Sequence, residues 1–197
     1  MNLTEKCVLT GGAVALSVSV GMVYGTFFLD SAHSDTSVIV SSIMIPRDVG
    51  ELSLNSDAVI VGVVDDIAVN RERSIFRAGE HDVVTTATVR VDRYLSNYGG
   101  LDAQVVKVKA LGGTVGDHTM VAEGSPDFEL GSKVVVFIYR FGKGDDYWVA
   151  GEAQGKFIVN ENDTLGTERE RPFVSSVFGK DDVTLSELES QIDSAVK

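Results

Sequence analysis

Cysteine is almost absent from this chain, and its single copy, Cys7, lies close to the N-terminus. No disulfide can therefore form within one molecule. Positive charge is also scarce, because 17 Lys and Arg residues stand against 29 Asp and Glu residues and leave a net charge of −12. An acidic protein repels nucleic-acid phosphates and anionic lipids, so we expect no nucleic-acid partner.

Signatures of nucleophilic catalysis are missing as well. The sequence contains no G-x-S-x-G nucleophile elbow, and after residue 7 it contains no cysteine that could act as a nucleophile. We therefore expect neither an enzyme nor a bound cofactor. An alternative stays open, namely a metal-dependent or carboxylate enzyme that uses the loops around Gly112–Pro126.

A long uncharged run extends over residues 7–29 and is rich in Val, Ala, Leu and Phe. About 20 apolar residues in a helix span the hydrocarbon core of a bilayer, so this run is predicted to be a transmembrane signal anchor. Lys6 precedes the run and acidic residues follow it, which favours residues 1–6 in the cytoplasm. We predict a single-pass membrane protein whose C-terminal domain lies outside.

The same run also fits a cleaved signal peptide. Val23 and Gly25 are small residues at the spacing that signal peptidase requires, which places cleavage near Gly25. In that alternative the domain is secreted, and in both cases it leaves the cytoplasm.

Small residues recur every four positions within the predicted membrane helix. Such a stripe lets two helices approach closely, which predicts a homodimer through the helix. Small residues are also frequent in membrane helices that do not pair. The stripe consists of Ala13, Ser17, Gly21 and Gly25.

Residues 30–55 are predicted to form a juxtamembrane linker and an arm. The apolar patch that Pro46 ends, over residues 38–45, indicates a short strand or an extended arm on the domain. Asp48 is placed to cap a short helix through Leu52 and Leu54.

A succession of Val- and Ile-rich runs, separated by Gly-rich turns, fills residues 56–160. This spacing, without amphipathic helices between the runs, predicts an all-β domain with minor α content, built as a small antiparallel barrel or sandwich. Gly62, inside the first run, indicates a bend or bulge, and the last two runs are interpreted as a hairpin-like end. The predicted strands are Ala58–Val69, Val83–Leu95, Val105–Leu111, Lys133–Tyr139, Tyr147–Ala150 and Lys156–Val159.

The chain is predicted to end in a helix. Residues 161–183 are interpreted as a loop or extended segment. Thr184 and Glu187 form a capping box that opens an amphipathic helix over residues 184–197, packed on the barrel. Its apolar positions are Leu185, Leu188, Ile192 and Val196.

Three stretches resemble a known family: residues 56–64 (SDAVIVGVV), 88–95 (TVRVDRYL) and 128–138 (FELGSKVVVFI). They resemble the netrin-like OB barrel of the tissue inhibitors of metalloproteinases and of exported prokaryotic proteins. The resemblance covers residues 56–159 and implies a five- or six-stranded Greek-key barrel with an exposed binding surface. It does not carry inhibitor function, because those inhibitors use an N-terminal cysteine and disulfides that this domain lacks.

The glycine-rich segment after residue 111 is the candidate binding loop. It follows a strand without opening a helix, so it is interpreted as a wide loop across the barrel mouth rather than a phosphate loop. Asp117 and His118 are candidate metal ligands, although Asp is also common in solvated turns. The candidate binding residues are Gly112, Gly113, Gly116, Asp117, His118 and Pro126.

Two further features of the sequence concern the aromatic residues near a turn and a possible glycosylation site. Phe141, Tyr147 and Trp148 cluster near a turn and form either a contact surface or, more in keeping with strand alternation, part of the core. Asn162 lies in an N-x-T glycosylation motif within a predicted turn.

Together these features favour a membrane-anchored extracytoplasmic binding or scaffold module that meets an unknown protein or envelope partner. The alternatives are the loop-based enzyme above and a purely structural cell-surface protein.

Overall fold

The computed structural model describes residues 36–40, 47–142 and 146–195. The predicted membrane helix over residues 7–29 lies outside them, and so does its stripe of Ala13, Ser17, Gly21 and Gly25. Within the described ranges, no helix combines the length and the apolar character needed to cross a bilayer.

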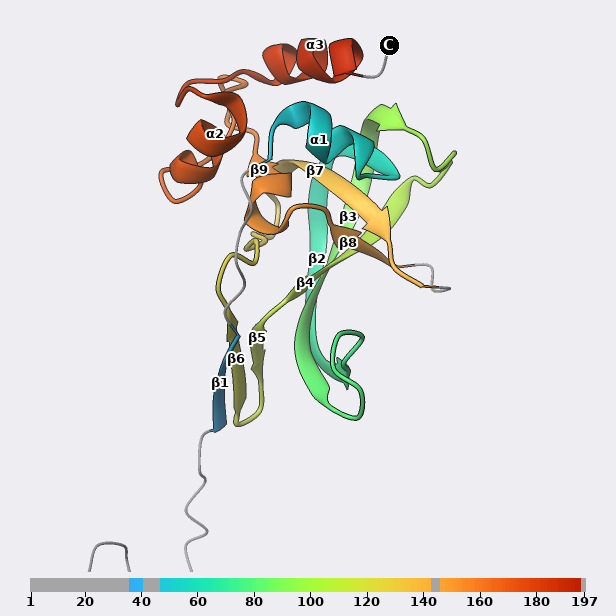
Figure 1. Cartoon of the computed structure of the whole chain (residues 1–197), viewed down its shortest axis with the longest axis vertical. Helices are drawn as coiled ribbons and strands as arrows, with labels where there is room; N and C mark the ends of the chain where they lie inside the picture. Colours follow the sequence, from blue (N-terminus) through green and yellow to red (C-terminus); the bar gives the residue numbers. More distant parts are fainter. Residues whose placement is uncertain (1–35, 41–46, 143–145, 196–197) are drawn as a thin grey trace, which may run out of the picture. The chain divides into compact units, whose positions relative to one another are not determined.

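The described part of the chain is mainly β with a few short helices (Figure 1). The strands are β1 (Thr36–Val40), β2 (Ala58–Arg73), β3 (His81–Asn97), β4 (Val105–Leu111), β5 (Gly113–Val115), β6 (His118–Ala122), β7 (Lys133–Arg140), β8 (Tyr147–Val149) and β9 (Lys156–Ile158). The helices are α1 (Val49–Leu54), the 3-10 turn η1 (Glu152–Gly155), α2 (Arg171–Phe178) and α3 (Leu185–Ala195).

Five strands form a closed ring of pairings in the order β2, β3, β4, β8, β7 and back to β2. The prediction of a purely antiparallel sheet was wrong, because β4 and β8 pair in parallel, with Val108 opposite Tyr147 and Lys109 opposite Trp148. Strand direction must alternate around an antiparallel ring, which an odd number of strands cannot do. One parallel pairing is therefore a consequence of closing five strands.

The first part of β2, residues 58–64, and most of β7 are buried on both faces. In β2, Ile60 packs with the core inside the ring, whereas Val59 and Val61 pack with the helices, and all three are 0% exposed. β7 follows the same alternation. Strands that are covered on both sides have continuous apolar runs. In β7, residues 134–138 are all buried, and the strand predicted over Lys133–Tyr139 is confirmed.

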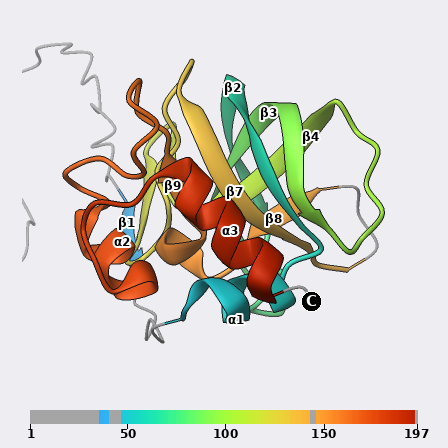
Figure 2. The same ribbon diagram turned by 90° about the horizontal axis from the view of Figure 1, so that it is seen from above.

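The inner core contains Ala58, Ile60, Val64, Ala87, Val89, Val106, Val108, Val134, Val136 and Ile138. The outer core joins β2 and β7 to the helices and contains Val59, Val61, Val135, Phe137, Leu52, Val174, Leu188 and Ile192. Figure 2 shows α1 and α3 on this outer side of the strands.

The predicted caps of α1 and α3 are confirmed. The Asp48 carboxylate accepts a hydrogen bond from the Glu51 amide at 2.8 Å. At α3, the Thr184 amide donates to Glu187 at 3.0 Å and the Glu187 amide donates to the Thr184 hydroxyl at 3.3 Å. The predicted α3 residue Val196 lies outside the described residues.

The loop predicted over residues 161–183 was wrong in its middle, where α2 forms. Pro172 stands in the first turn of α2, where its missing N–H costs nothing. Gly179 ends α2 with a φ of 71°, and Val174 and Val177 are buried one turn apart. This short helix was missed because its apolar positions are too few to give a clear period.

The hairpin-like end predicted for β8 and β9 was also wrong. Both strands pair antiparallel with the same edge of β7, β8 through Ile138 and β9 through Val136. η1 carries the chain from one to the other. Successive strands that lie end to end along a third strand cannot be distinguished from a hairpin by their apolar pattern.

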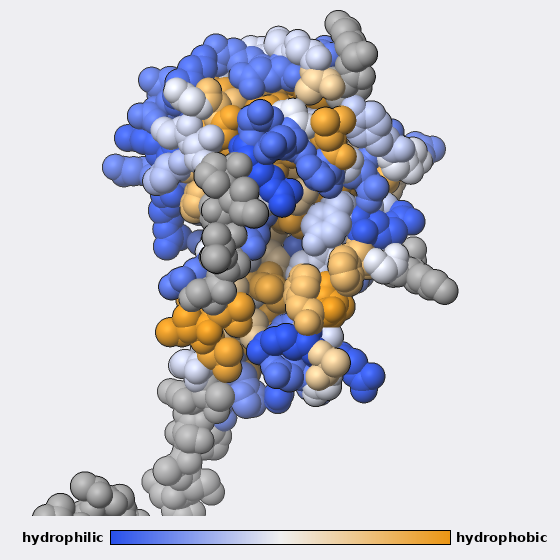
Figure 3. Space-filling view, viewed as in Figure 1, coloured by the Kyte–Doolittle hydropathy of each residue, from blue (hydrophilic) through white to orange (hydrophobic). Residues whose placement is uncertain are grey.

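A second sheet has the order β1, β6, β5, with β1 and β6 parallel. The wide loop predicted over residues 112–116 was wrong, because Gly113–Val115 is β5 and pairs with β6. Gly112 and Gly113 have φ of 103° and 126° and turn the chain sharply out of β4. A Cβ on Gly113 would lie 2.6 Å from Val69, so glycine also permits the close approach of β5 to β2. Apolar surface lies over this sheet (Figure 3).

Candidate functional site

Two pockets meet at Ser125 and Pro126, which line both of them. The first, here called the apolar pocket, has a volume of about 190 Å³. Its walls come from the end of β1, from β4, from the end of β6, and from β7 and β8. Its lining residues include Val40, Phe76, Leu111, Ala122, Tyr139 and Trp148.

Phe76 reaches the apolar pocket from the loop between β2 and β3. Its ring centroid lies 5.8 Å from that of Trp148 in an edge-on arrangement and 5.9 Å from that of Phe141. Phe76 and Phe141 are 54% and 46% exposed, whereas Trp148 is 8% exposed. The exposed ring of Phe76 thus contacts both the exposed ring of Phe141 and the buried ring of Trp148, and Phe76 and Trp148 line the pocket.

The loop that carries Phe76 has a defined internal structure. The Ser74 amide donates to the carbonyl oxygen of Glu80 at 2.9 Å. The Ser74 hydroxyl accepts from the Phe76 and Arg77 amides at 3.2 and 2.9 Å. Arg77 donates to Asp82, which is 3% exposed, and this hydrogen bond raises the pKa of the Arg77 guanidinium.

Lys109 supplies a paired charge beside the aromatic rings. Its ammonium lies 2.8 Å from both Glu72 and Asp146, and its side chain is 14% exposed. Burial works to lower the pKa of Lys109, but the hydrogen bonds to Asp146 and Glu72 outweigh it and raise that pKa. Lys109 therefore stays charged and engaged with its partners.

The remaining polar lining of the apolar pocket is acidic or neutral. Glu123 and Glu152 line the pocket. Burial raises the pKa of Tyr139, and the charge of Glu152 raises it further, so its phenol stays neutral at physiological pH. The lining therefore combines apolar side chains with acidic ones, and its apolar part can contact an apolar group.

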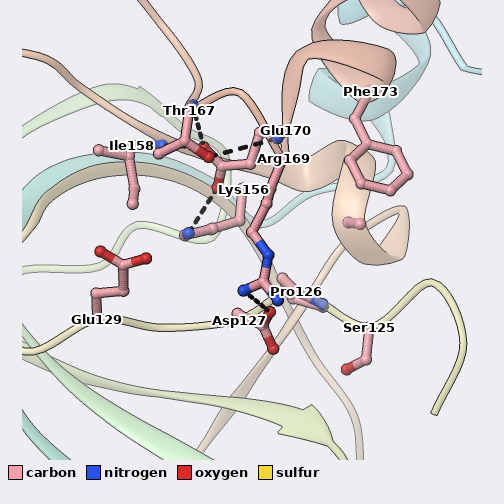
Figure 4. A pocket seen from close by; sticks show the side chains of 11 residues that line it. Ser125, Pro126, Asp127, Glu129, Lys156, Ile158, Thr167, Arg169, Glu170 and Phe173 are labelled. Atoms are coloured by element: carbon pink, nitrogen blue, oxygen red, sulfur yellow. Dashed lines mark hydrogen bonds and ion pairs between the residues drawn. The ribbon is translucent and has the colours of Figure 1, made fainter.

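The second pocket, here called the polar pocket, has a volume of about 250 Å³ (Figure 4). Lys156 is 2% exposed, and its ammonium lies 2.7 Å from one carboxylate oxygen of Glu170. The other oxygen of Glu170 accepts from the amides of Ile158 at 3.1 Å and Thr167 at 2.9 Å. This network joins β9 to the start of α2, so its first role is to hold the C-terminal segment in place.

The predicted binding residues do not gather around either pocket. Gly112 and Gly113 turn the chain into β5, Gly116 and Asp117 lie in the turn between β5 and β6, and His118 begins β6. Of the six candidates, only Pro126 lines these pockets, and it lines both of them. Across the described ranges, no three His, Cys, Asp or Glu side chains converge as metal ligands.

The other predicted features have definite places. Tyr147 and Trp148 are both buried, at 5% and 8% exposure, as the core interpretation expected. Asn162 is exposed in the predicted turn, where its side-chain oxygen accepts from the Thr164 hydroxyl at 2.7 Å. Sequence reasoning missed Phe76, whose signal is an apolar Ile75–Phe76 pair inside a polar turn.

A comparison with models of known protein families found no match to this chain. A search of curated proteins likewise found no relative.

Proposed function

We propose that this protein is a membrane-anchored extracytoplasmic binding module that holds an apolar side chain of a protein or envelope partner in the apolar pocket. The observation that carries the proposal is the solvent-facing ring of Phe76, which lines the pocket and contacts both the exposed ring of Phe141 and the buried ring of Trp148. Aromatic groups that stay at a pocket mouth are the usual anchors of recognition surfaces.

The size of the apolar pocket supports a side chain as its occupant. Sites for complete small-molecule ligands measure about 300–1,000 Å³. At about 190 Å³ the apolar pocket is smaller, so we infer that it takes one apolar side chain from an extended segment. The net charge of −12 favours a partner with basic residues beside that side chain.

We further propose that the five-strand ring is an OB-like Greek-key barrel. Support comes from its closure of β2 onto β7 and from the parallel pairing of β4 with β8. OB barrels bind ligands at their second and third strands and at the loops between strands one and two and between strands four and five. Here those loops carry Phe76 and Phe141, and the third strand of the ring, β4, carries Lys109.

The location proposed for the module follows from the uncharged run over residues 7–29, which provides either an anchor or a secretion signal. We propose that the run stays attached as a single-pass anchor with the N-terminus inside.

Trp148, the single tryptophan of the chain, gives a direct test of the pocket. Full-length protein in nanodiscs of zwitterionic lipid is titrated with the capped peptide Lys-Phe-Lys, and Trp148 fluorescence is recorded. We expect a saturable change with a dissociation constant of roughly 1 mM or tighter. Capped Lys-Ala-Lys should cause no such change, because it lacks the side chain that fills the pocket.

A matched pair of variants separates pocket filling from general effects. Ala122→Phe places a ring in the apolar pocket and should weaken binding at least about tenfold, or ~1.4 kcal/mol. Ala68→Phe makes the same change at an exposed position of β2 and should leave binding unchanged. Equal responses to the two tripeptides, or equal affinities in the two variants, would rule out the proposed site.

A further inference from the structure

Among the described strands, β1 forms an edge of the second sheet, here called the open edge. Within the part of the chain that the structure describes, β1 pairs with β6 and with no other strand. Its sequence, TSVIV, contains no charge and no proline. Natural edge strands are commonly protected by lysine, proline or a bulge, and β1 has none of these protections.

The backbone of β1 determines which groups face this open edge. The Glu123 amide donates to the Val40 carbonyl at 2.9 Å, so the backbone of Val40 faces β6. Backbone groups point alternately to the two sides of a strand. Val38 therefore also faces β6, and the N–H and C=O groups of Ser37 and Ile39 face the open edge.

Apolar side chains accompany these backbone groups. Ile39 is 69% exposed and Val121, its partner in the register with β6, is 50% exposed. Figure 3 shows the apolar surface that covers this sheet. Such a surface next to backbone groups that no described strand pairs is suited to adding a strand.

We propose that β1 pairs antiparallel with β1 of a second copy of this chain, with Val38 opposite Val38 and Ser37 opposite Ile39. In this register the outward backbone groups of Ser37 and Ile39 form the hydrogen-bonded pairs. The strand is uncharged, so self-pairing brings no like charges together, whereas the rest of the chain is strongly acidic. A two-fold rotation maps this register onto itself, as a symmetric dimer requires.

The length of chain before β1 favours a second copy over other partners. The inference rests at this point on the proposed membrane anchor, which would end at residue 29. Residues 30–35 then span at most roughly 20 Å, because an extended chain covers about 3.3 Å per residue. Anchored copies would hold their β1 strands within a thin layer over the same membrane, which raises their effective concentration.

Disulfide crosslinking of full-length protein tests the register. In a Cys7→Ser background, Val38→Cys should form a dimer on mild oxidation, because Cα atoms in this type of pair lie about 4.5 Å apart and disulfides tolerate that distance. Val121→Cys is the matched control. Its two copies would be separated by three strand spacings, roughly 14 Å, which is beyond disulfide reach. We expect at least about tenfold more dimer from Val38→Cys.

Ile39→Pro tests the backbone contact itself. It removes an outward N–H while the β1–β6 hydrogen bonds remain, and proline is tolerated on edge strands. Added to the Val38→Cys variant, it should abolish the crosslink. Equal crosslinking of the two cysteine variants, a crosslink that survives Ile39→Pro, or no crosslink from Val38→Cys would overturn the proposal.

The same measurement on purified protein in detergent does not depend on where the chain lies in the cell. Failure of β1 pairing is therefore distinguishable from failure of the membrane placement and from failure of the Trp148 titration.

Discussion

Lys156 and Glu170 are two charges that the fold removes almost completely from water. Their ion pair, together with the amides of Ile158 and Thr167, supplies three hydrogen bonds to the two oxygens of the Glu170 carboxylate. Such a pair contributes little compared with an apolar pair, but removal of one partner leaves the other buried and uncompensated. At the scale of single residues, the polar pocket is thus a connection between β9 and α2.

Glu170→Gln should therefore lower the free energy of unfolding by about 3 kcal/mol, measured by urea denaturation. The double variant Lys156→Met with Glu170→Gln should recover part of this loss, because no unpaired charge remains. Arg169→Gln is the control: Arg169 and Asp127 are 82% and 79% exposed, so its effect should be below about 0.5 kcal/mol. Equal losses for Glu170→Gln and Arg169→Gln would contradict this role.

Gly62 provides the second case at this scale. The predicted bulge is confirmed, because the β2–β3 register shifts between Val61 and Gly62. A Cβ at Gly62 would lie 2.3 Å from the Arg90 carbonyl oxygen. That oxygen belongs to the backbone of the neighbouring strand and cannot move away without disturbing the strand pairing.

Gly62→Ala should lower the free energy of unfolding by about 2–3 kcal/mol, because it forces two paired strands apart. Gly116→Ala is the comparison, since nothing lies within 4 Å of its Cβ position and its φ is +56°. That variant should lose only about 1 kcal/mol from backbone strain. Thermal unfolding followed by circular dichroism measures both, and equal losses would remove the steric explanation.

Among the elements, α3 begins at a capping box that the sequence shows directly, formed by Thr184 and Glu187. Glu187 accepts hydrogen bonds from Lys180 at 2.8 Å and from the Thr184 amide at 3.0 Å. These two bonds, the first being the larger effect, lower the pKa of Glu187 below its ordinary 4.5. A carboxyl group with a lowered pKa in the folded state stabilises that state above the ordinary pKa and stops doing so as the pH falls through the lowered one.

Glu187→Gln should therefore be less stable than the original protein at pH 7. The difference should shrink as the pH falls from 4.5 through the lowered pKa, because below the lowered pKa both proteins carry a neutral side chain at this position. Urea unfolding at neutral and acidic pH provides the comparison. Glu189→Gln, on the same helix but outside the capping box, is the control, and a difference independent of pH would contradict the assignment.

The loop that carries Phe76 is also an element in its own right. Ser74 organises its turn and the buried Asp82 holds Arg77. The loop therefore places Phe76 on Trp148 by its own hydrogen bonds rather than by contacts of the aromatic rings alone.

At the scale of the whole molecule, the proposed membrane placement depends on the difference between the uncharged run over residues 7–29 and the acidic sequence that follows it. After residue 29 the acidic residues still outnumber the basic ones. We expect such a segment to stay in water and residues 7–29 to prefer hydrocarbon.

Full-length protein should therefore remain in the membrane pellet after carbonate extraction. Protease that is given access to the outer face of the membrane of intact cells should digest residues after 29, because the domain would lie outside that membrane. A cytosolic marker protein should resist the same treatment. Unprocessed protein that is soluble and protected from protease would contradict the placement.

The sequence by itself determined the features that local physics controls. The strand at residues 133–139, the caps of α1 and α3 and the bulge at Gly62 could all be predicted, because strand-forming runs and capping chemistry act over a few residues. Tertiary structure decided the rest. The parallel pairing of β4 with β8, β5 in place of a loop, and the contact of Phe76 with Trp148 all join distant segments. The apolar pattern of a strand indicates which of its faces is buried, but it does not indicate which strand lies beside it. In the ring, the neighbours of each strand are determined by how the five strands close.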